Sequence, residues 1–208
     1  PDPTALLPGA PRAEATRGVP RECRVMVATR WTPALVDWLV AGGRVLFMPA
    51  KGEGSILTKY VNMWGQNPLV IETPPAEGPI GPGESDWVCD LLDYDLNRFS
   101  MRAVPSDELE IVDRVQPIIR LVYTHDMQDR IKPFDQVCAA RVGKGLLCIS
   151  TLDHGEPAGG LMLDRLLAWL SRDDATSSGE LSADLVRGWV DAVVEPTKPP
   201  AGFAMATE

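Results

Sequence analysis

The chain has 208 residues, 45% of them hydrophobic, so it is long enough for one domain with a sizeable core and tails. Its formal net charge is −9 and it contains no run of Lys or Arg, which excludes the basic surface that a nucleic-acid-binding protein uses. It also lacks any apolar run near the roughly 20 residues of a membrane-spanning helix, so neither nucleic acid nor membrane is an expected partner.

Both ends of the chain are expected to lie outside the main domain. Residues 1–22 contain five Pro and no hydrophobic periodicity, which indicates a Pro-rich linker or arm. Residues 195–208 are expected to form a flexible tail, because Pro and Gly gather there as well. Between these ends, the pattern predicts an α/β domain over 23–172 and a C-terminal helix over 173–194.

The first regular segments predict a strand, a helix and a second strand. Residues 24–29 have the apolar pattern of a buried strand, and residues 32–41 begin with Thr and Pro, the types preferred at a helix N-cap and first turn. Two glycines at 42–43 end the helix, and residues 44–48 predict the next strand. This order, with short loops, is typical of a parallel βαβ unit in a sheet that is covered on both faces.

Residues 49–105 are expected to form an irregular insertion. Their regular pattern breaks down, with a Pro/Gly-rich stretch at 73–83 and a short helix expected at 86–92. Trp64 and Trp87 lie within this insertion. Long irregular excursions of this kind usually carry a functional loop or an interface loop.

Regular patterns resume after the insertion. They predict strands at 109–115, 118–124, 136–141 and 146–150, and amphipathic helices at 160–171 and 181–194. The Gly-containing turn at 142–145 joins two of these strands, so it predicts an antiparallel hairpin near the C-terminus. Trp38 and Trp169 lie on predicted helix faces and are expected in the core.

Four segments in this order resemble a known family. They are Leu39–Leu46 (LVAGGRVL), Val115–Arg120 (VQPIIR), Ala139–Ser150 (AARVGKGLLCIS) and Leu163–Leu170 (LDRLLAWL). Together, over residues 24–171, they resemble the class I glutamine-amidotransferase-like module near the C-terminus of glycoside hydrolase family 2 and related multidomain glycosidases. The resemblance implies an α/β, flavodoxin-like fold: a mostly parallel sheet flanked by helices, with the antiparallel hairpin towards the C-terminus.

The resemblance also implies that the amidotransferase chemistry has been lost. Class I amidotransferases hold their catalytic Cys on a strand-to-helix elbow between glycines, and none of Cys23, Cys89, Cys138 and Cys148 has that context. Cys89 is followed by Asp90, whose charge disfavours a thiolate. The wide spacing of the four cysteines also lacks the pairing of a zinc site, so we expect small core residues and no metal.

His125 and His154 remain as catalytic candidates. Each follows a predicted strand, at the kind of strand end where α/β folds collect their sites, and each has acidic neighbours. A pair formed by one of them with Ser150 or Cys148 would make the chain a stand-alone hydrolase or amidotransferase-like enzyme. The alternative is that these histidines hydrogen-bond loops or lie on the surface.

A carbohydrate-binding module is a third interpretation. Trp31, Trp64 and Trp87 offer rings on which the C–H face of a sugar can stack, and Trp64, Trp87, Asp93 and Asp95 are the candidate carbohydrate or interface contacts. The alternative for the tryptophans is burial against the sheet or a neighbouring domain. The alternative for the two carboxylates is a solvated acidic loop.

The resemblance implies a non-catalytic accessory module of a glycoside hydrolase that acts on poly- or oligosaccharides, serving as scaffold, interdomain or oligomerisation contact. Its partners would be the catalytic domain of the same polypeptide or another subunit, with carbohydrate as a further partner and no cofactor. The family 2 catalytic barrel is a separate domain, which 208 residues with this βαβ pattern do not also hold. We expect a soluble protein, secreted or periplasmic where the parent protein carries a signal peptide.

Overall fold

The computed structural model describes residues 23–50, 52–61, 69–71, 78–80, 101–123 and 132–194. The predicted arm at 1–22, the helix at 86–92 and the tail at 195–208 lie outside these ranges.

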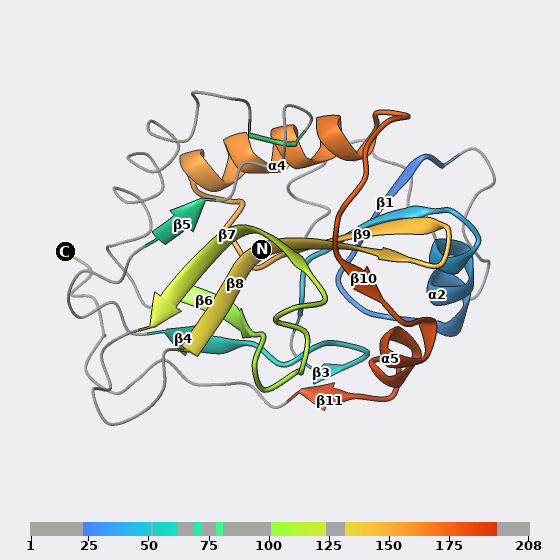
Figure 1. Ribbon diagram of the computed structural model, residues 1–208, viewed down its shortest axis with the longest axis horizontal. Helices are drawn as coiled ribbons and strands as arrows, with labels where there is room; N and C mark the ends of the chain where they lie inside the picture. Colours follow the sequence, from blue (N-terminus) through green and yellow to red (C-terminus); the bar gives the residue numbers. More distant parts are fainter. Residues whose placement is uncertain are drawn as a thin grey trace.

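Nine of the strands in the described residues form one sheet at the centre of the fold (Figure 1). Its main path runs through β1 (Val25–Ala28), β2 (Arg44–Phe47), β9 (Gly145–Ser150), β8 (Lys132–Val142), β6 (Met101–Pro105) and β4 (Lys59–Val61). Two further strands pair with β8, namely β7 (Gln116–Tyr123), which also carries β5 (Leu69–Ile71), and β10 (Glu180–Leu181). A separate small antiparallel sheet pairs β3 (Gly52–Glu53) with β11 (Val193–Val194).

The sheet is mixed. Its parallel part is β1–β2–β9, in which Val25 lies opposite Arg44 and Arg44 lies opposite Leu146, and β10 pairs parallel with the end of β8. The remaining pairs extend the sheet in the antiparallel sense. The predicted βαβ unit is confirmed because β1 and β2 are parallel neighbours joined by a helix. The predicted hairpin is confirmed as β8–β9, where Val142 pairs with Gly145.

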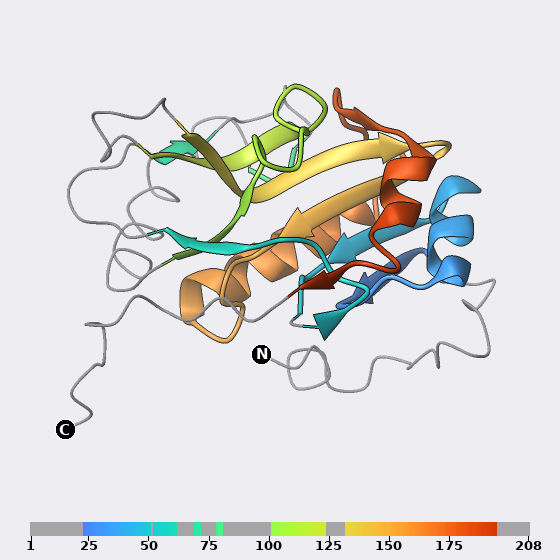
Figure 2. The ribbon, with the colours of Figure 1, turned by 90° about the horizontal axis from the view of Figure 1, so that it is seen from below.

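Helices cover both faces of the sheet, which confirms the predicted α/β class. The helices α2 (Pro33–Val40) and α5 (Ala183–Gly188) lie side by side on one face, and α4 (Pro157–Leu170) lies on the other (Figure 2). Neighbouring residues of a strand point to opposite faces, so Val45 and Phe47 join the core under α2 while Leu46 and Met48 join the core under α4.

Local chemistry accounts for α2. The side chain of Thr32 accepts a hydrogen bond from the backbone N–H of Leu35 at 3.2 Å, as an N-cap does, and Pro begins the helix as predicted. Its apolar residues Leu35, Val36 and Leu39 are buried. Directly before the helix, Trp31 is buried with its ring 4.7 Å from the ring of Phe47. The interpretation of Trp31 as an exposed sugar platform is therefore wrong.

Two predicted elements are wrong. The segment 109–115 forms turns, not a strand: Ile111 and Val115 are both buried, and the N–H of Val115 bonds to the C=O of Ile111 at 3.1 Å. The predicted C-terminal helix over 173–194 is a turn followed by β10, α5 and β11, with Ser182 as the N-cap of α5. In both places, the apolar residues belong to turns or to several short elements. A single helical or strand periodicity therefore does not predict their structure.

Other boundaries differ from the predictions. The helix expected from residue 160 begins at Pro157, and the strand expected over 136–141 extends to Lys132–Val142. The described parts of the predicted irregular insertion contain β3, β4, β5 and β6, so 49–105 is not irregular throughout. Each of these short strands has a partner that supplies the stability it lacks alone: β5 pairs with β7, β6 with β8, β4 with β6, and β3 with β11.

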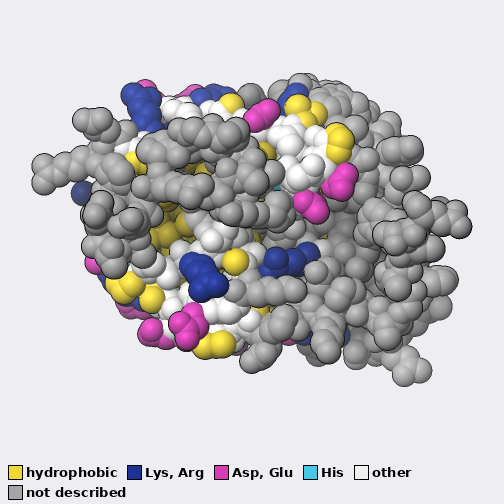
Figure 3. Space-filling view, turned by 180° about the vertical axis from the view of Figure 1, so that it is seen from behind, with side chains coloured by type: hydrophobic (Ala, Val, Ile, Leu, Met, Phe, Trp, Pro, Cys, Tyr) yellow, Lys and Arg dark blue, Asp and Glu magenta, His cyan; other side chains and the backbone are white. Residues whose placement is uncertain are grey.

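The described surface shows no large field of one sign on the face seen in Figure 3, where Lys and Arg side chains are interspersed with Asp and Glu. Within the described ranges, no helix is long and apolar enough to cross a membrane.

Candidate functional site

Of the candidates taken from the sequence, the structure describes Trp31, Cys148, Ser150 and His154. Those outside the described residues are Trp64, Trp87, Asp93, Asp95 and His125.

His154 lies in the loop between β9 and α4 and contacts Ser150, the last residue of β9. The hydroxyl oxygen of Ser150 is 2.9 Å from Nε2 of His154, and Nδ1 is 2.7 Å from the carbonyl oxygen of Gly159. A carbonyl only accepts, so Nδ1 carries the ring proton and Nε2 accepts from the serine hydroxyl. The structure thus brings together one of the nucleophile–base pairs that the sequence suggested, with a backbone carbonyl orienting the base.

The neutral ring is the form that this environment favours. Burial lowers the pKa of His154 below its ordinary value of 6.5, although the bond to Gly159 and the charge of Asp153 act in the opposite direction. A neutral imidazole accepting from a hydroxyl is also the state that a general base requires. The hydrogen bonds and the protonation state of His154 therefore fit a catalytic pair and a structural pair equally well.

Burial distinguishes the two. Ser150 is 1% exposed and His154 is 3% exposed. Ser150 continues the alternation of Leu146 and Cys148, so its side chain points to the face covered by α4. A substrate carbonyl has to approach within about 3 Å of a nucleophile. In this conformation the Ser150 hydroxyl is closed to solvent, so the pair acts as a connection between β9 and the start of α4.

A close backbone contact holds this loop in place. A Cβ atom at Gly159 would lie 1.9 Å from the carbonyl oxygen of Asp153, closer than any side chain tolerates. Only glycine allows the 153–154 loop to lie against the first turn of α4 at this point. The same contact puts the carbonyl of Gly159 within reach of the His154 ring.

The described cysteines are free thiols in unreactive surroundings. Cys138 and Cys148 are buried in the sheet, as predicted, and burial raises the pKa of both thiols. Cys23 is half-buried, and burial also raises its pKa. These environments favour the protonated thiol, which is a poor nucleophile.

The segments that carry the family resemblance lie at junctions between elements. In the first, Gly43 is so close to the indole of Trp38 that a Cβ atom would lie 2.3 Å from Cε3. In the third, a Cβ atom at Gly145 would lie 2.0 Å from the carbonyl oxygen of Leu39 and 2.5 Å from that of Gly43. The close packing of the β8–β9 hairpin against the end of α2 and the turn after it therefore requires glycine at these positions.

The second and fourth segments serve the same purpose. Gln116 begins β7, and its side-chain oxygen accepts from the N–H of Ser178 at 2.9 Å, which ties the chain after α4 to the sheet. The fourth segment supplies the buried face of α4 through Leu163, Leu166 and Trp169. In this chain, the four segments thus take part in packing and hydrogen-bond contacts between elements.

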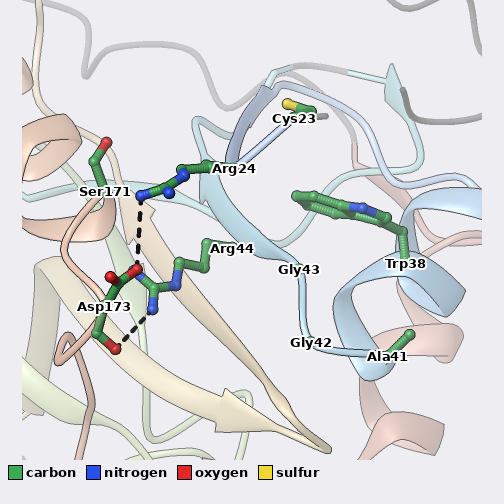
Figure 4. Close-up of a pocket in the computed structure, with 9 residues that line it drawn as sticks. All are labelled: Cys23, Arg24, Trp38, Ala41, Gly42, Gly43, Arg44, Ser171 and Asp173. Atoms are coloured by element: carbon green, nitrogen blue, oxygen red, sulfur yellow. Dashed lines mark hydrogen bonds and ion pairs between the residues drawn. The ribbon is translucent and has the colours of Figure 1, made fainter. Parts of the chain in front are cut away.

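A pocket of about 390 Å³ opens at the amino ends of β1 and β2 (Figure 4). Sequence reasoning missed it. Arg24 and Arg44 extend from the starts of the two strands towards Asp173 in the turn after α4, and Trp38 of α2 forms the opposite side of the lining. Trp38, expected in the core, is only half-buried, because its ring lies at the end of α2 beside this opening.

Arg44 has a structural role at one wall of the pocket. Its guanidinium donates to the carbonyl oxygens of Leu170 at 2.7 Å and Asp173 at 3.1 Å, and also to that of Arg172. Leu170 ends α4, and Arg172 and Asp173 lie in the turn that follows, where backbone acceptors lack helical partners and the helix dipole is negative. The arginine of the GGR segment thereby joins β2 to the end of α4.

Comparisons with protein-family models and with curated proteins give no match for the chain.

Proposed function

We propose that the chain is a non-catalytic accessory module of a glycoside hydrolase acting on poly- or oligosaccharides, with an architectural role between domains or subunits. The observation that carries the proposal is the place of the four resembling segments, which meet at the junctions of α2, the β8–β9 hairpin, β7 and α4. A chain that keeps such a pattern keeps the scaffold, which suits an interdomain or oligomerisation role.

The finer fold class is part of this proposal. The β1–α2–β2 unit, with β9 parallel to β2 and helices on both faces, supports a flavodoxin-like core of the amidotransferase-like type. The antiparallel strands β4 to β8 would then be the elaboration of that core in this chain.

The test compares the product of the complete native gene with this 208-residue chain. Intact mass and hydrolysis of a panel of chromogenic glycosides are measured for both. The proposal expects a product several times larger that hydrolyses glycosides, beside an inert 208-residue chain. A native product of this size, or glycosidase activity in the 208-residue chain, would contradict it.

A stand-alone hydrolase is the second candidate, because Ser150 and His154 form a hydrogen-bonded pair with the base in the required tautomer. It requires an opening that exposes the Ser150 hydroxyl. The test is turnover of short activated esters and amides by the unmodified chain, by Ser150→Ala and by Ser178→Ala, in which an exposed serine is removed. Turnover that is lost only in Ser150→Ala would favour the hydrolase, and no turnover in any of the three would reject it.

A further inference from the structure

The pocket at the amino ends of β1 and β2 contains groups that the scaffold does not use fully. At about 390 Å³ its volume falls in the lower part of the roughly 300–1,000 Å³ range of ligand pockets. It lies at the edge of the sheet opposite to Ser150, which ends β9. It is therefore separate from the buried Ser150–His154 pair.

The charged groups of the pocket retain hydrogen-bonding capacity. The guanidinium of Arg24 is 3.6 Å from the Oδ1 atom of Asp173, too far for a hydrogen bond, and the two side chains are 75% and 94% exposed. The three backbone carbonyls that Arg44 contacts use only some of the N–H donors of its guanidinium. The pocket thus offers N–H donors and a carboxylate acceptor a short distance apart, as Figure 4 shows.

Trp38 adds an apolar wall to these polar groups. The contact of Gly43 with the indole holds the ring in place, and the half-buried ring borders the pocket (Figure 4). The negative face of an aromatic ring attracts C–H bonds that carry a small positive charge. A ligand whose flat face carries C–H groups would therefore pack that face against Trp38, and its polar groups would point to the other walls of the pocket.

These walls select among classes of ligand. An anion would gain from the guanidiniums of Arg24 and Arg44 but would lie beside the carboxylate of Asp173 and the carbonyls that end α4. A cation would face the two guanidiniums, and a purely apolar ligand would leave them desolvated. A neutral ring with hydroxyl groups donates to Asp173, accepts from the arginines and presents C–H bonds to Trp38.

We infer that this pocket binds a neutral pyranose ring, either a free sugar or the end of an oligosaccharide chain. The inference rests on the proposed function only for the choice of sugars, because the pocket groups themselves specify the ligand class. The accessory module would then hold a carbohydrate near its parent enzyme through Trp38, Arg24 and Asp173, and not only join domains.

The experiment titrates the 208-residue chain by calorimetry and ligand-observed NMR. The probes are the methyl glycosides of glucose, galactose, mannose and xylose, the disaccharides cellobiose, maltose and lactose, and inorganic phosphate. Saturable binding of at least one sugar is expected. Stronger binding of the methyl glycosides would point to free sugars, and stronger binding of the disaccharides would point to chain ends.

Matched variants locate the binding. Asp173→Asn should weaken sugar binding by roughly tenfold, as loss of a charged hydrogen-bond acceptor does. Asp174→Asn is the control, because Asp174 is the neighbouring carboxylate and pairs with Arg172 at 2.7 Å and 2.9 Å. Arg24→Gln should also weaken binding, whereas Arg187→Gln, which changes an exposed arginine bonded to Asp37 and Asp184, should not. Trp38→Ala should abolish binding, with unfolding measured beside it, since Trp38 also packs on Gly43.

Three results would overturn the inference: no sugar binds, a bound sugar is unaffected by Asp173→Asn, or phosphate binds in place of sugars. Sugar binding by a chain whose complete gene product is not a glycosidase would keep this inference and remove the proposed function. An active glycosidase whose module binds no sugar would do the reverse.

Discussion

The hydroxyl oxygen of Ser150 lies 2.9 Å from Nε2 of His154, and both side chains are buried between the end of β9 and the start of α4. They lie four positions apart in the chain, and the loop between them turns back because Gly159 admits the carbonyl of Asp153 at close range. The pair therefore couples the sheet to the helix that covers it.

Removing the hydroxyl at this position should destabilise the fold. Ser150→Ala leaves Nε2 of His154 buried without its donor, which costs about 1–3 kcal/mol of unfolding free energy. Urea unfolding at neutral pH measures the change. Ser178→Ala removes an exposed serine hydroxyl and should stay within roughly 0.5 kcal/mol of the unmodified chain. Equal stability of the two variants would show that the Ser150–His154 bond contributes nothing.

His154 should make the stability depend on pH. Its folded pKa lies below the ordinary value of 6.5, so the unfolded chain takes up a proton at a higher pH than the folded chain. The contribution of the neutral His154 ring to the free energy of unfolding is complete above pH 6.5, and it is lost as the pH falls through the folded pKa. Unfolding free energies measured across this window should decline for the unmodified chain, but much less for His154→Asn. An unchanged slope in His154→Asn would assign the effect to other groups.

Two adjacent glycines at the start of α4 should respond in opposite directions. A methyl group at Gly159 would lie 1.9 Å from the carbonyl oxygen of Asp153, so Gly159→Ala should destabilise by about 1–3 kcal/mol. At Gly160 the nearest atom is 3.7 Å away, an ordinary contact, so Gly160→Ala should stabilise the helix by about 0.5–1 kcal/mol. Thermal unfolding of the two variants gives the comparison, and two changes of the same sign would contradict the geometry.

The ion pair between β7 and β8 should matter more than those on the surface. Asp135 is fully buried and accepts from Nε of Arg120 at 2.6 Å and from its Nη2 at 3.0 Å, with Ser106 as a further donor. Asp135→Asn removes the carboxylate beside a largely buried guanidinium and should cost about 3–5 kcal/mol.

A surface pair provides the control for this change. The Arg141–Glu180 pair has side chains that are 50% and 71% exposed, so Glu180→Gln should cost less than about 1 kcal/mol. Chemical unfolding of both variants measures the difference. Comparable losses in the two would mean that burial does not strengthen the Arg120–Asp135 pair.

The buried cysteines should resist alkylation in the native state. Burial raises the pKa of Cys138 and Cys148, so few thiolates form and reagent access is poor. Iodoacetamide labelling followed by peptide mass spectrometry should show both thiols modified only after addition of denaturant. Rapid native labelling of Cys148 would indicate an activated thiol and would weaken the proposal of a non-catalytic module.

The best-predicted part of the fold is the unit from β1 to β2. A Thr–Pro start, a pair of glycines at the end and two short apolar strands act within a few residues of each other, so the chain itself specifies these elements. The β8–β9 hairpin was predictable for the same reason, because Gly143 has a positive φ of 60° in a tight turn.

The sequence pattern predicted the wrong element where apolar residues pack or pair with distant parts of the chain. Ile111 and Val115 fill the core from a pair of turns, although their spacing suggested a strand. The apolar residues after position 180 belong to β10, α5 and β11, since Leu181 pairs with Val142 and Val194 pairs with Gly52. Partners so far away in the chain leave no local signal.

The sequence by itself determined the α/β class, the βαβ unit and the hairpin, because these follow from periodicity, capping and short spacings. It also indicated Ser150 or Cys148 with His125 or His154 as candidate pairs, without choosing among them. Only the tertiary structure decided that the Ser150–His154 pair is closed to solvent, and that Arg24, Trp38, Arg44 and Asp173 share one pocket. The physical reason is that burial and pocket walls arise when separate elements pack, and packing joins residues that the chain keeps far apart.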